Sequence, residues 1–356
     1  MTALGDILKA QIAATGPVRL DAFMAACLMH PEHGYYTTRD PFGAAGDFTT
    51  APEISQMFGE LIGLCLAQTW MDQGAPNPFA LAELGPGRGT LMVDLLRATK
   101  GIPGFHNALS GIHLVEASPA LRARQAERLS HADTEWHDTV ETLPNMPLFA
   151  VANEFFDALP IRQFQRSGDG WSERMVGLTD DQFTFGLGPV HAEDVLAHRL
   201  EDTKEGDLVE IAPAATGIIT ALSQRISAHG GAALIIDYGD WRSLGDTLQA
   251  VHGHDTATIF DAPGEADLSA HVDFEALAHA ATDGCRYSRV TPQGVFLERL
   301  GITARAQTLA QSMTGDSLDA HIAAHRRLTH PEEMGTLFKV MALYPKAAAP
   351  PPGLDA

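Results

Sequence analysis

The sequence predicts an α/β fold on a mostly parallel sheet, and three observations carry the prediction. Residues 79–84 form an apolar run of the length expected for a buried strand. A glycine-bearing loop follows over 85–89, and helical spacing of apolar residues then extends over 90–97. Shorter apolar runs recur at 111–116 and 148–153, with polar or helical segments between them. Strands that alternate with helices are typical of parallel α/β folds.

The loop after the first strand predicts a cofactor site, formed by Gly85, Pro86, Gly87 and Gly89. Glycines let the backbone turn tightly and approach a ligand, and the helix that follows offers free N–H groups. In the dinucleotide fingerprint the third glycine comes three positions after the second, whereas here it comes after two. Glu83, on the strand, can instead face the amino group of S-adenosylmethionine. The spacing therefore favours S-adenosylmethionine over a dinucleotide, with a ligand-free βα turn as the alternative.

Two further carboxylates follow neighbouring predicted strands. Glu116 ends the second strand about one crossover after the glycines, where an acidic residue can accept hydrogen bonds from both ribose hydroxyls. It could also cap the helix that begins near Ser118. Asp138 ends a candidate strand at 134–138, where a carboxylate can reach the adenine amino group or cap the next turn. We expect both residues to contact the cofactor.

Asn153, Glu154 and Asp157 follow the strand predicted at 148–153. Ligands of open α/β sheets bind beyond the carboxyl ends of the strands, so these residues lie where a methyl acceptor is expected. Two carboxylates could hold a guanidinium by bidentate bonds and accept its proton during transfer. The alternative is that Asp157 caps a turn and that Glu154 is partly solvated. We take the three residues as the candidate catalytic group.

The N-terminal part predicts helices over 4–14 and 20–29, followed by a long loop over 42–52. The amphipathic pattern of 53–70 predicts a third helix. Thr50 and Glu53 match a capping box at its start, with Pro52 in the first turn. The loop is either an ordered connection or a lid over the cofactor.

The pattern divides the chain into five parts. They are an N-terminal helical region with a cofactor-covering loop (1–75), the first half of the core (76–160), a β-rich insertion (161–206), the second half of the core with inserted helices (207–345) and a disordered tail rich in Ala and Pro (346–356). Within the second half, we expect irregular structure over 246–273 and the last strands over 287–301 and 337–343.

Composition narrows the classes of function. A formal charge of -21 excludes binding to nucleic acid through a general phosphate field and favours cationic partners. Three scattered cysteines argue against disulfides and against a cysteine zinc site, and we expect no metal. Neither a signal peptide nor an apolar run of membrane-spanning length is seen, which predicts a cytoplasmic protein without membrane insertion. A homodimer stays open.

Six blocks of the sequence resemble the MidA-like family of S-adenosylmethionine-dependent methyltransferases, which has bacterial and mitochondrial members. They are GYYTTRDPFGAAGDFTTAPEISQMFGELIG, ELGPGRGTLMVDLLR, HLVEASPALR, NEFFDALPIRQF, LIIDYG and TPQGVFLERLGI, in this order over about residues 4–343. The resemblance implies a seven-stranded, mostly parallel Rossmann-like methyltransferase sheet with added N-terminal helices and a β-rich insertion. It also implies protein arginine methylation, with a subunit of respiratory complex I, the NADH:ubiquinone oxidoreductase, as acceptor and partner. The chain lacks a transit peptide and so resembles a bacterial, cytoplasmic member.

By position, the resemblance implies that Glu83, the three loop glycines and Glu116 bind the cofactor. It places Asp47, Thr50, Pro52 and Glu53 in an N-terminal loop motif near the cofactor. Two other functions stay open. One is an assembly or interaction protein that binds S-adenosylmethionine without transferring a methyl group, and the other is a nucleotide-dependent oxidoreductase, which the glycine spacing disfavours.

Overall fold

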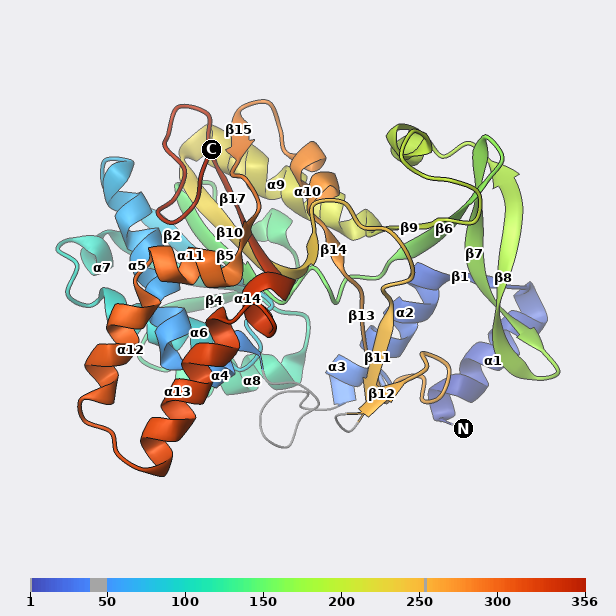
Figure 1. The fold of residues 1–356 in the computed structure, drawn as a ribbon, viewed down its shortest axis with the longest axis horizontal. Coiled ribbons are helices and arrows are strands. Elements are labelled where there is room, and N and C mark those ends of the chain that lie inside the picture. Colours follow the sequence, from blue (N-terminus) through green and yellow to red (C-terminus); the bar gives the residue numbers. More distant parts are fainter. Residues whose placement is uncertain (1, 39–49, 253–254) are drawn as a thin grey trace.

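A computed structural model describes residues 2–38, 50–252 and 255–356. The largest sheet of the protein has nine strands (Figure 1). The strands are β2 (Phe79–Leu84), β3 (Leu109–Val115), β4 (Thr134–His137), β5 (Leu148–Asn153), β10 (Gly231–Asp240), β14 (Val272–Asp273), β15 (Cys285–Tyr287), β16 (Thr291–Pro292) and β17 (Phe338–Pro345). Seven run in the order β15-β17-β10-β5-β2-β3-β4, while β14 pairs with β10 and β16 with β17. The pairs from β4 to β10 are parallel, but β17 is antiparallel to its neighbours. The α/β class is confirmed; the sheet is mixed and has two short strands beyond the seven expected.

Apolar clusters cover both faces of this sheet. On one face lie α5 (Gln56–Asp72), α6 (Thr90–Thr99), α7 (Phe105–Ala108), α11 (Gln293–Arg299), α12 (Ile302–Ala310), α13 (Asp316–Thr329) and α14 (Met334–Leu337). The helix α8 (Pro119–Arg128) connects β3 to β4. On the other lie α9 (Pro213–His229), α10 (Phe274–Ala280) and the short 3-10 helix η1 (Val140–Thr142). Strands buried on both faces read as continuous apolar runs, which is why β2 and β5 were predictable with their observed bounds.

A second, antiparallel sheet stands at one end of the molecule (Figure 1). It comprises β1 (Val18–Arg19), β6 (Arg162–Ser167), β7 (Gly170–Thr179), β8 (Gln182–His191) and β9 (Leu208–Ile211), and η2 (Asp194–Leu200) lies between β8 and β9. The β7–β8 turn is at Asp180 and Asp181, both with positive φ, as the Asp-Asp pair indicates. The N-terminal helices α1 (Ala3–Thr15) and α2 (Leu20–Met29) pack against this sheet.

Residues 246–273 are more regular than expected. They carry a small antiparallel sheet of β11 (Gln249–His252), β12 (Asp255–Ala257) and β13 (Asp267–Ser269), which packs in the same apolar cluster as α1 and α2. The strand expected across 287–301 is wrong over 293–299, which form α11 with Phe296 and Leu297 buried. Two adjacent buried apolar residues suit either a strand or a helix, so spacing alone does not separate them.

The predicted capping box is also wrong. The helix divides into α4 (Ala51–Ile54) and α5, with Ser55 between them capping α5 through its side chain. Thr50 makes no side-chain capping bond, and Glu53 instead accepts a hydrogen bond from Thr90 Oγ1 at 2.5 Å. A tertiary partner has therefore replaced the local one.

The tail over 346–356 is packed rather than disordered. Leu354 is 7 % exposed and belongs to the same apolar cluster as α5 and α11. The backbone oxygen of Asp355 accepts from the Arg289 N–H at 2.9 Å, and its carboxylate pairs with Arg299 at 2.9 Å. Composition rich in Ala and Pro does not reveal these contacts because they depend on distant residues.

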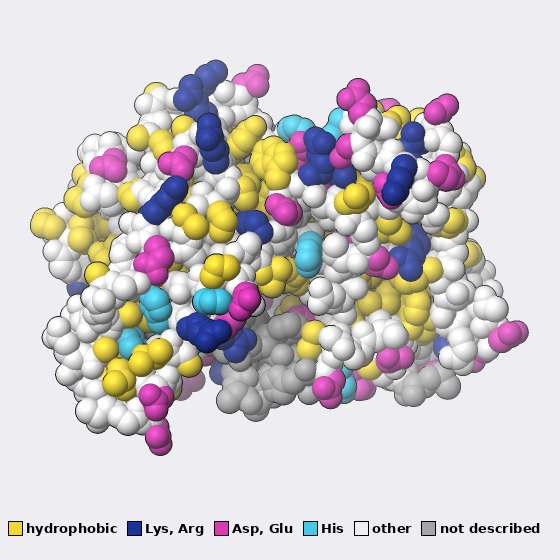
Figure 2. Space-filling view, in the orientation of Figure 1, with side chains coloured by type: hydrophobic (Ala, Val, Ile, Leu, Met, Phe, Trp, Pro, Cys, Tyr) yellow, Lys and Arg dark blue, Asp and Glu magenta, His cyan; other side chains and the backbone are white. Residues whose placement is uncertain are grey.

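Charged side chains of both signs are interspersed on the face shown in Figure 2. Of the helices in the described part of the chain, none has the length and apolar character needed to traverse a bilayer. The remaining short helix, α3 (Tyr35–Thr38), follows α2 and brings Tyr36 toward the core sheet.

Candidate functional site

A cavity of about 520 Å³ opens at the carboxyl ends of β2, β3, β4 and β5. Its lining includes Gly85, Gly87, Glu116, Asp138 and Glu154, five of the residues singled out from the sequence. Much of the remaining wall is apolar, with residues from α2, α8 and α9. A mostly apolar cavity with few polar groups at this edge of an α/β sheet is typical of a cofactor site.

The glycine loop runs along the floor of this cavity. Gly85, Gly87 and Gly89 have φ values of +62°, +52° and +77°, in the left-handed region that favours glycine. A Cβ on Gly85 would lie 2.8 Å from Cδ2 of Phe155, so a side chain there would also displace the next strand's loop. The three glycines are thus required by the backbone path itself. Gly89 lines neither this cavity nor the smaller pocket described below.

Glu116 is held by two donors. Its Oε1 accepts from the Ser118 N–H at 2.8 Å, and its Oε2 accepts from Nε2 of Gln125 at 3.2 Å. The same Gln125 nitrogen donates to the Gly87 carbonyl at 2.7 Å, so one buried amide joins the glycine loop to Glu116. Burial raises the pKa of Glu116. Glu116 therefore accepts a hydrogen bond from the turn before α8 and also lines the cavity, so both interpretations of this residue hold.

Asp138 lies at the rim of the cavity, largely exposed and paired with Arg122. The Arg122 Nε also donates to the Glu116 carbonyl at 2.6 Å. Arg122 therefore bridges the ends of β3 and β4.

A smaller pocket lies on the other side of the glycine loop. It is lined by Thr50, Pro52, Glu53, Glu83, Gly85, Pro86, Gly87, Arg88, Thr90, Leu91, Asn153 and Glu154. The Glu83 carboxyl is 3 % exposed, and its Oε2 has no hydrogen-bond partner among the described residues. Burial raises the pKa of Glu83 well above its usual value, and only the Met92 N–H offsets this. A buried carboxylate oxygen without a partner is costly, which suits an incoming cationic amino group.

Glu154 joins the two pockets because it lines both. It has a φ of +51°, uncommon for a residue with a side chain, at the turn that leaves β5. Its Oε1 accepts from the Ala51 N–H and from Nδ2 of Asn153, each at 2.9 Å. The Glu154 carboxylate thus connects the N-terminal segment, through Ala51, to the carboxyl end of β5, through Asn153.

Asp237, three residues before the end of β10, fixes this turn. Its Oδ2 accepts from the N–H groups of Phe155, Phe156 and Asp157 at 3.1, 2.9 and 3.2 Å. Such a set of donors holds the chain in the strained conformation that Glu154 adopts. The sequence offers the Asp-Tyr-Gly ending of a strand as the only signal, so Asp237 was not among the predicted site residues.

Three carboxyl groups therefore lie close together at the ends of β5 and β10. Burial, reinforced by Asp157, raises the pKa of Glu154 to about 7. Burial raises that of Asp157 to about 6, and Asp157 Oδ1 has no hydrogen-bond partner among the described residues. Asp237, buried and facing both neighbours, also has a raised pKa. The group can take up a cation or a proton near neutral pH.

Tyr36 belongs to the site although it was not among the predicted residues, whereas two predicted residues, Asp157 and Asp47, are not among the described residues that line the pockets. Tyr36 lines the large cavity and donates from its hydroxyl to Oδ1 of Asp267 at 2.8 Å, while its carbonyl accepts from Ser118 Oγ. Its role could not be read from spacing because α3 and β3 are distant in sequence. Asp157 lines neither pocket, although its neighbour Ala158 does. Asp47 lies outside the described residues.

The site fits an S-adenosylmethionine-type cofactor on its own geometry. A left-handed glycine turn, an acidic residue after β3 and a buried Glu83, whose Oε2 has no hydrogen-bond partner among the described residues, surround two adjoining pockets on one sheet edge. This combination defines the class of S-adenosylmethionine-dependent methyltransferases of α/β type.

Comparison with known proteins gives the family. Residues 61–292 match the family model described as "Putative S-adenosyl-L-methionine-dependent methyltransferase". The chain belongs to this methyltransferase family, and S-adenosylmethionine is its cofactor.

Relatives of known name match over nearly the whole chain. The mitochondrial protein arginine methyltransferase NDUFAF7 of Xenopus laevis is 35% identical over 96% of this chain and 84% of its own length. The human protein of the same name is 36% identical over 95% and 82%. A crystal structure from Burkholderia thailandensis with bound S-adenosyl-homocysteine has a TM-score of 0.84 at 30% identity, covering 99% of this chain and 94% of that one.

Proposed function

We propose that the protein transfers a methyl group from S-adenosylmethionine to a nitrogen of an arginine in a protein, with a subunit of respiratory complex I as the acceptor. The similarity to named protein arginine methyltransferases supports this proposal. The observation that carries it is the position of Glu154, a carboxylate on the walls of both pockets, with Asp157 close enough to raise its pKa.

We assign the cofactor residues by pocket. In the large cavity, Glu116 accepts from the ribose hydroxyls and Asp138 from the adenine amino group. In the small pocket, Glu83 takes the amino group of the methionine part, whose cationic charge compensates the buried carboxylate. The loop of Gly85, Pro86, Gly87 and Gly89 gives backbone contacts.

The N-terminal loop motif closes the small pocket in this assignment. Thr50 and Pro52 line it, and Glu53 ties α4 to Thr90 at the first residue of α6. We extend the proposal to Asp47 as part of the same covering motif.

A bound cofactor would supply an electrophilic methyl group on its sulfonium sulfur: the acceptor nitrogen would attack this carbon in line with the C–S bond, and S-adenosylhomocysteine would leave with the electron pair of that bond. Glu154 would hold the guanidinium by charge-assisted hydrogen bonds, with Asn153 orienting its carboxylate. Asp157, which lines neither pocket, would act through Glu154, whose pKa it raises. Since burial places the pKa of Glu154 at about 7, this carboxylate can accept the proton that the alkylated nitrogen loses. Apolar walls exclude water from the site.

The test separates binding from transfer. Wild-type protein, Glu154→Gln and Gly87→Val are titrated calorimetrically with S-adenosylmethionine, and turnover is followed by mass spectrometry on the host's complex I subunits. We expect Glu154→Gln to bind the cofactor within about threefold of wild type but to lose on the order of 10² in kcat. Gly87→Val should lose cofactor binding because of its φ of +52°.

Two outcomes would contradict the proposal. Equal turnover of Glu154→Gln and wild type would remove the role of that carboxylate. Tight binding of the cofactor with no methylated arginine in any subunit would favour the alternative of an assembly protein that binds without transfer.

A further inference from the structure

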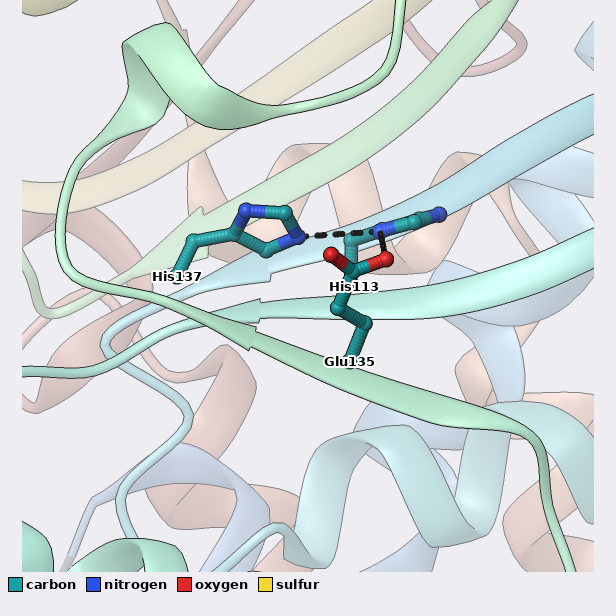
Figure 3. A group of neighbouring side chains, drawn as sticks. All are labelled: His113, Glu135 and His137. Atoms are coloured by element: carbon teal, nitrogen blue, oxygen red, sulfur yellow. Dashed lines mark hydrogen bonds and ion pairs between the residues drawn. The ribbon is translucent and has the colours of Figure 1, made fainter.

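Away from the cavity, His113, Glu135 and His137 form a cluster on the outer strands β3 and β4 (Figure 3). One ligand atom from each lies within 4.8 Å of the others. His113 Nδ1 is 3.0 Å from His137 Nε2 and 3.7 Å from a carboxylate oxygen of Glu135. Side chains two apart on a strand share a face, and β3 pairs His113 with Glu135. The three residues therefore gather by sheet register and not by accident of a loop.

We propose that this cluster is a zinc-binding site with two imidazole ligands and one carboxylate. Zinc takes nitrogen and oxygen ligands in a tetrahedral arrangement with bonds of about 2.0 Å, which places two nitrogens about 3.3 Å apart. The observed 3.0 Å needs a separation only a few tenths of an ångström larger. The fourth position would hold water.

A neighbouring hydroxyl orients one ligand correctly. Thr142 Oγ1 donates to the Thr139 carbonyl at 3.0 Å, so it accepts from His137 Nδ1–H at 2.8 Å. His137 Nε2 then carries a lone pair and accepts from His113 Nδ1–H in the metal-free cluster. A metal ion between the two nitrogens would replace this hydrogen bond, with the His113 proton moving to Nε2 of its own ring. A hydrogen bond from the second ring nitrogen is the usual support of a metal-bound histidine.

The cluster is both sheltered and reachable. His113 and His137 are 7 % and 5 % exposed, so two of the three ligands are sheltered from solvent. The Glu135 side chain is 69% exposed and gives an entry path from solvent. An exposed ligand with an open position is typical of an exchangeable site, in contrast to closed structural zinc sites.

The position has a consequence for the cofactor cavity. The His137 carbonyl accepts from the Glu116 N–H at 3.0 Å, and Asp138 follows His137 directly. A bound ion would therefore clamp β3 to β4 one step before both strands enter the cavity wall. The site is independent of the proposed acceptor and its test does not use methyl transfer.

The experiment uses full-length, tag-free protein stripped with a chelator. Co²⁺ is titrated in, its visible absorption reports tetrahedral coordination, and Zn²⁺ is then added in competition. We expect one Co²⁺ per chain, displaced by Zn²⁺. Glu135→Gln and His113→Gln each remove a ligand and should weaken metal binding by tenfold or more. Thr142→Val removes the hydrogen bond that orients His137 and should weaken it by about 10–100-fold.

Matched controls decide the result. Glu127→Gln and His131→Gln change exposed residues of the same types nearby and should leave binding unchanged. Because Glu135 is exposed, its variant should fold like the wild type, which circular dichroism checks. Cobalt or zinc binding that is equal in wild type and Glu135→Gln, or absent from wild type, would overturn the proposal.

Discussion

At the scale of single residues, the site contains carboxyl groups whose burial opposes their ionisation. Glu83, Glu154 and Asp237 are carboxyl groups placed where burial disfavours ionisation. Glu154 also adopts a strained φ of +51°. These groups cost stability in the free protein, which is consistent with positions selected for a ligand and not for the fold.

The pH dependence of stability follows for Glu154. Its pKa rises from 4.5 to about 7 on folding, so its protonated form favours the folded state. That contribution is fully present below the pKa of the unfolded chain and is lost as pH rises through about 7. Glu154→Gln cannot ionise and keeps an oxygen for the Ala51 N–H. We expect it to be more stable than wild type by on the order of 2–3 kcal/mol at pH 8, with little difference near pH 4.5.

Urea denaturation at the two pH values measures this difference. Glu127→Gln, an exposed residue on α8, provides the control and should show none. A gain for Glu154→Gln of equal size at both pH values would mean that the effect is steric and not ionic.

The residues that sequence reasoning found and missed differ in a physical way. Gly85, Glu83 and Glu116 follow from strand, turn, helix and second strand in one βαβ unit, so a local pattern contains them. Gln125 and Asp237 act across the sheet, through hydrogen bonds to residues 38 and 80 to 82 positions away. No local pattern encodes such a partner.

At the scale of elements, α5 and α6 are joined by close approach of their backbones. Gly63 on α5 faces α6, and a Cβ there would lie 2.9 Å from the Leu95 Cα. Gly59 makes a similar approach to Asp94 one turn earlier. The amphipathic pattern of 53–70 predicts α5. It does not predict how closely the α5 backbone approaches α6, because that depends on the residues of both helices.

This contact predicts opposite results for one substitution at two helical glycines. Gly63→Ala should destabilise by about 1–3 kcal/mol because the added methyl meets backbone that cannot move aside. Gly217→Ala, on α9 with nothing within 4 Å of its Cβ position, should stabilise by about 0.4–1 kcal/mol. Thermal unfolding compares the two directly. A loss of stability in both would show that the helical backbone at Gly217, and not space, decides the outcome.

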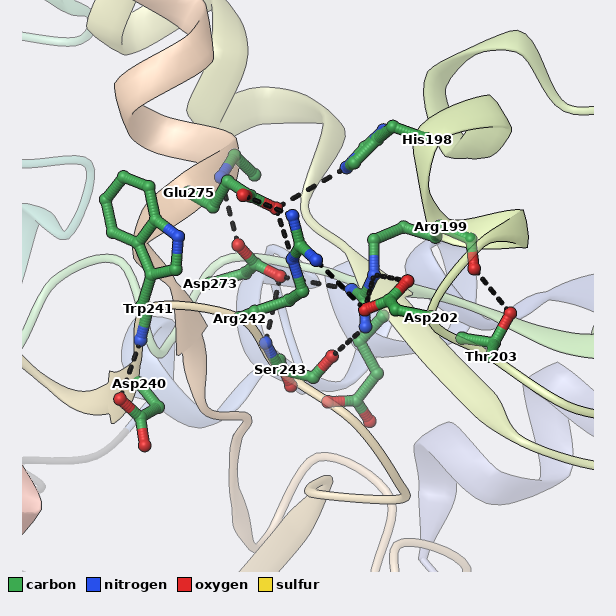
Figure 4. A network of polar contacts seen from close by, with 12 residues as sticks. His198, Arg199, Asp202, Thr203, Asp240, Trp241, Arg242, Ser243, Asp273 and Glu275 are labelled. Atoms are coloured by element: carbon green, nitrogen blue, oxygen red, sulfur yellow. Dashed lines mark hydrogen bonds and ion pairs between the residues drawn. The ribbon is translucent and has the colours of Figure 1, made fainter.

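A charged network links the antiparallel sheet to the core (Figure 4). Arg199 on η2 is 2 % exposed, donates to the Ser243 carbonyl at 3.0 Å and pairs with Asp202 at 3.1 Å. Arg242 binds both oxygens of Glu275 at the start of α10 and also reaches Asp202. The sequence shows an insertion between two core strands; these ion pairs show how it is fixed to the core.

At the scale of the whole molecule, the C-terminal segment completes the core. Pro352 offers its carbonyl to the Cys65 thiol at 3.4 Å, and Gly353, with a φ of +85°, turns the chain so that Leu354 points inward. The sequence predicted the sheet class because apolar runs report burial. It predicted disorder for the tail because a single leucine among Ala, Pro and Gly carries no periodicity.

Leu354→Ala tests whether this segment stabilises the fold or merely lies on it. Leu354 is 7 % exposed within a cluster that includes α5 and α11, so truncation should cost about 2–3 kcal/mol through lost burial and a residual cavity. Leu337→Ala is the matched control, since that side chain is 47% exposed and should cost well under 1 kcal/mol beyond helix propensity. Denaturant unfolding of both variants supplies the comparison. Equal, small losses would mean that 346–356 is docked too weakly to count as part of the core, whereas a selective loss at Leu354 would make the tail a structural element of the methyltransferase domain.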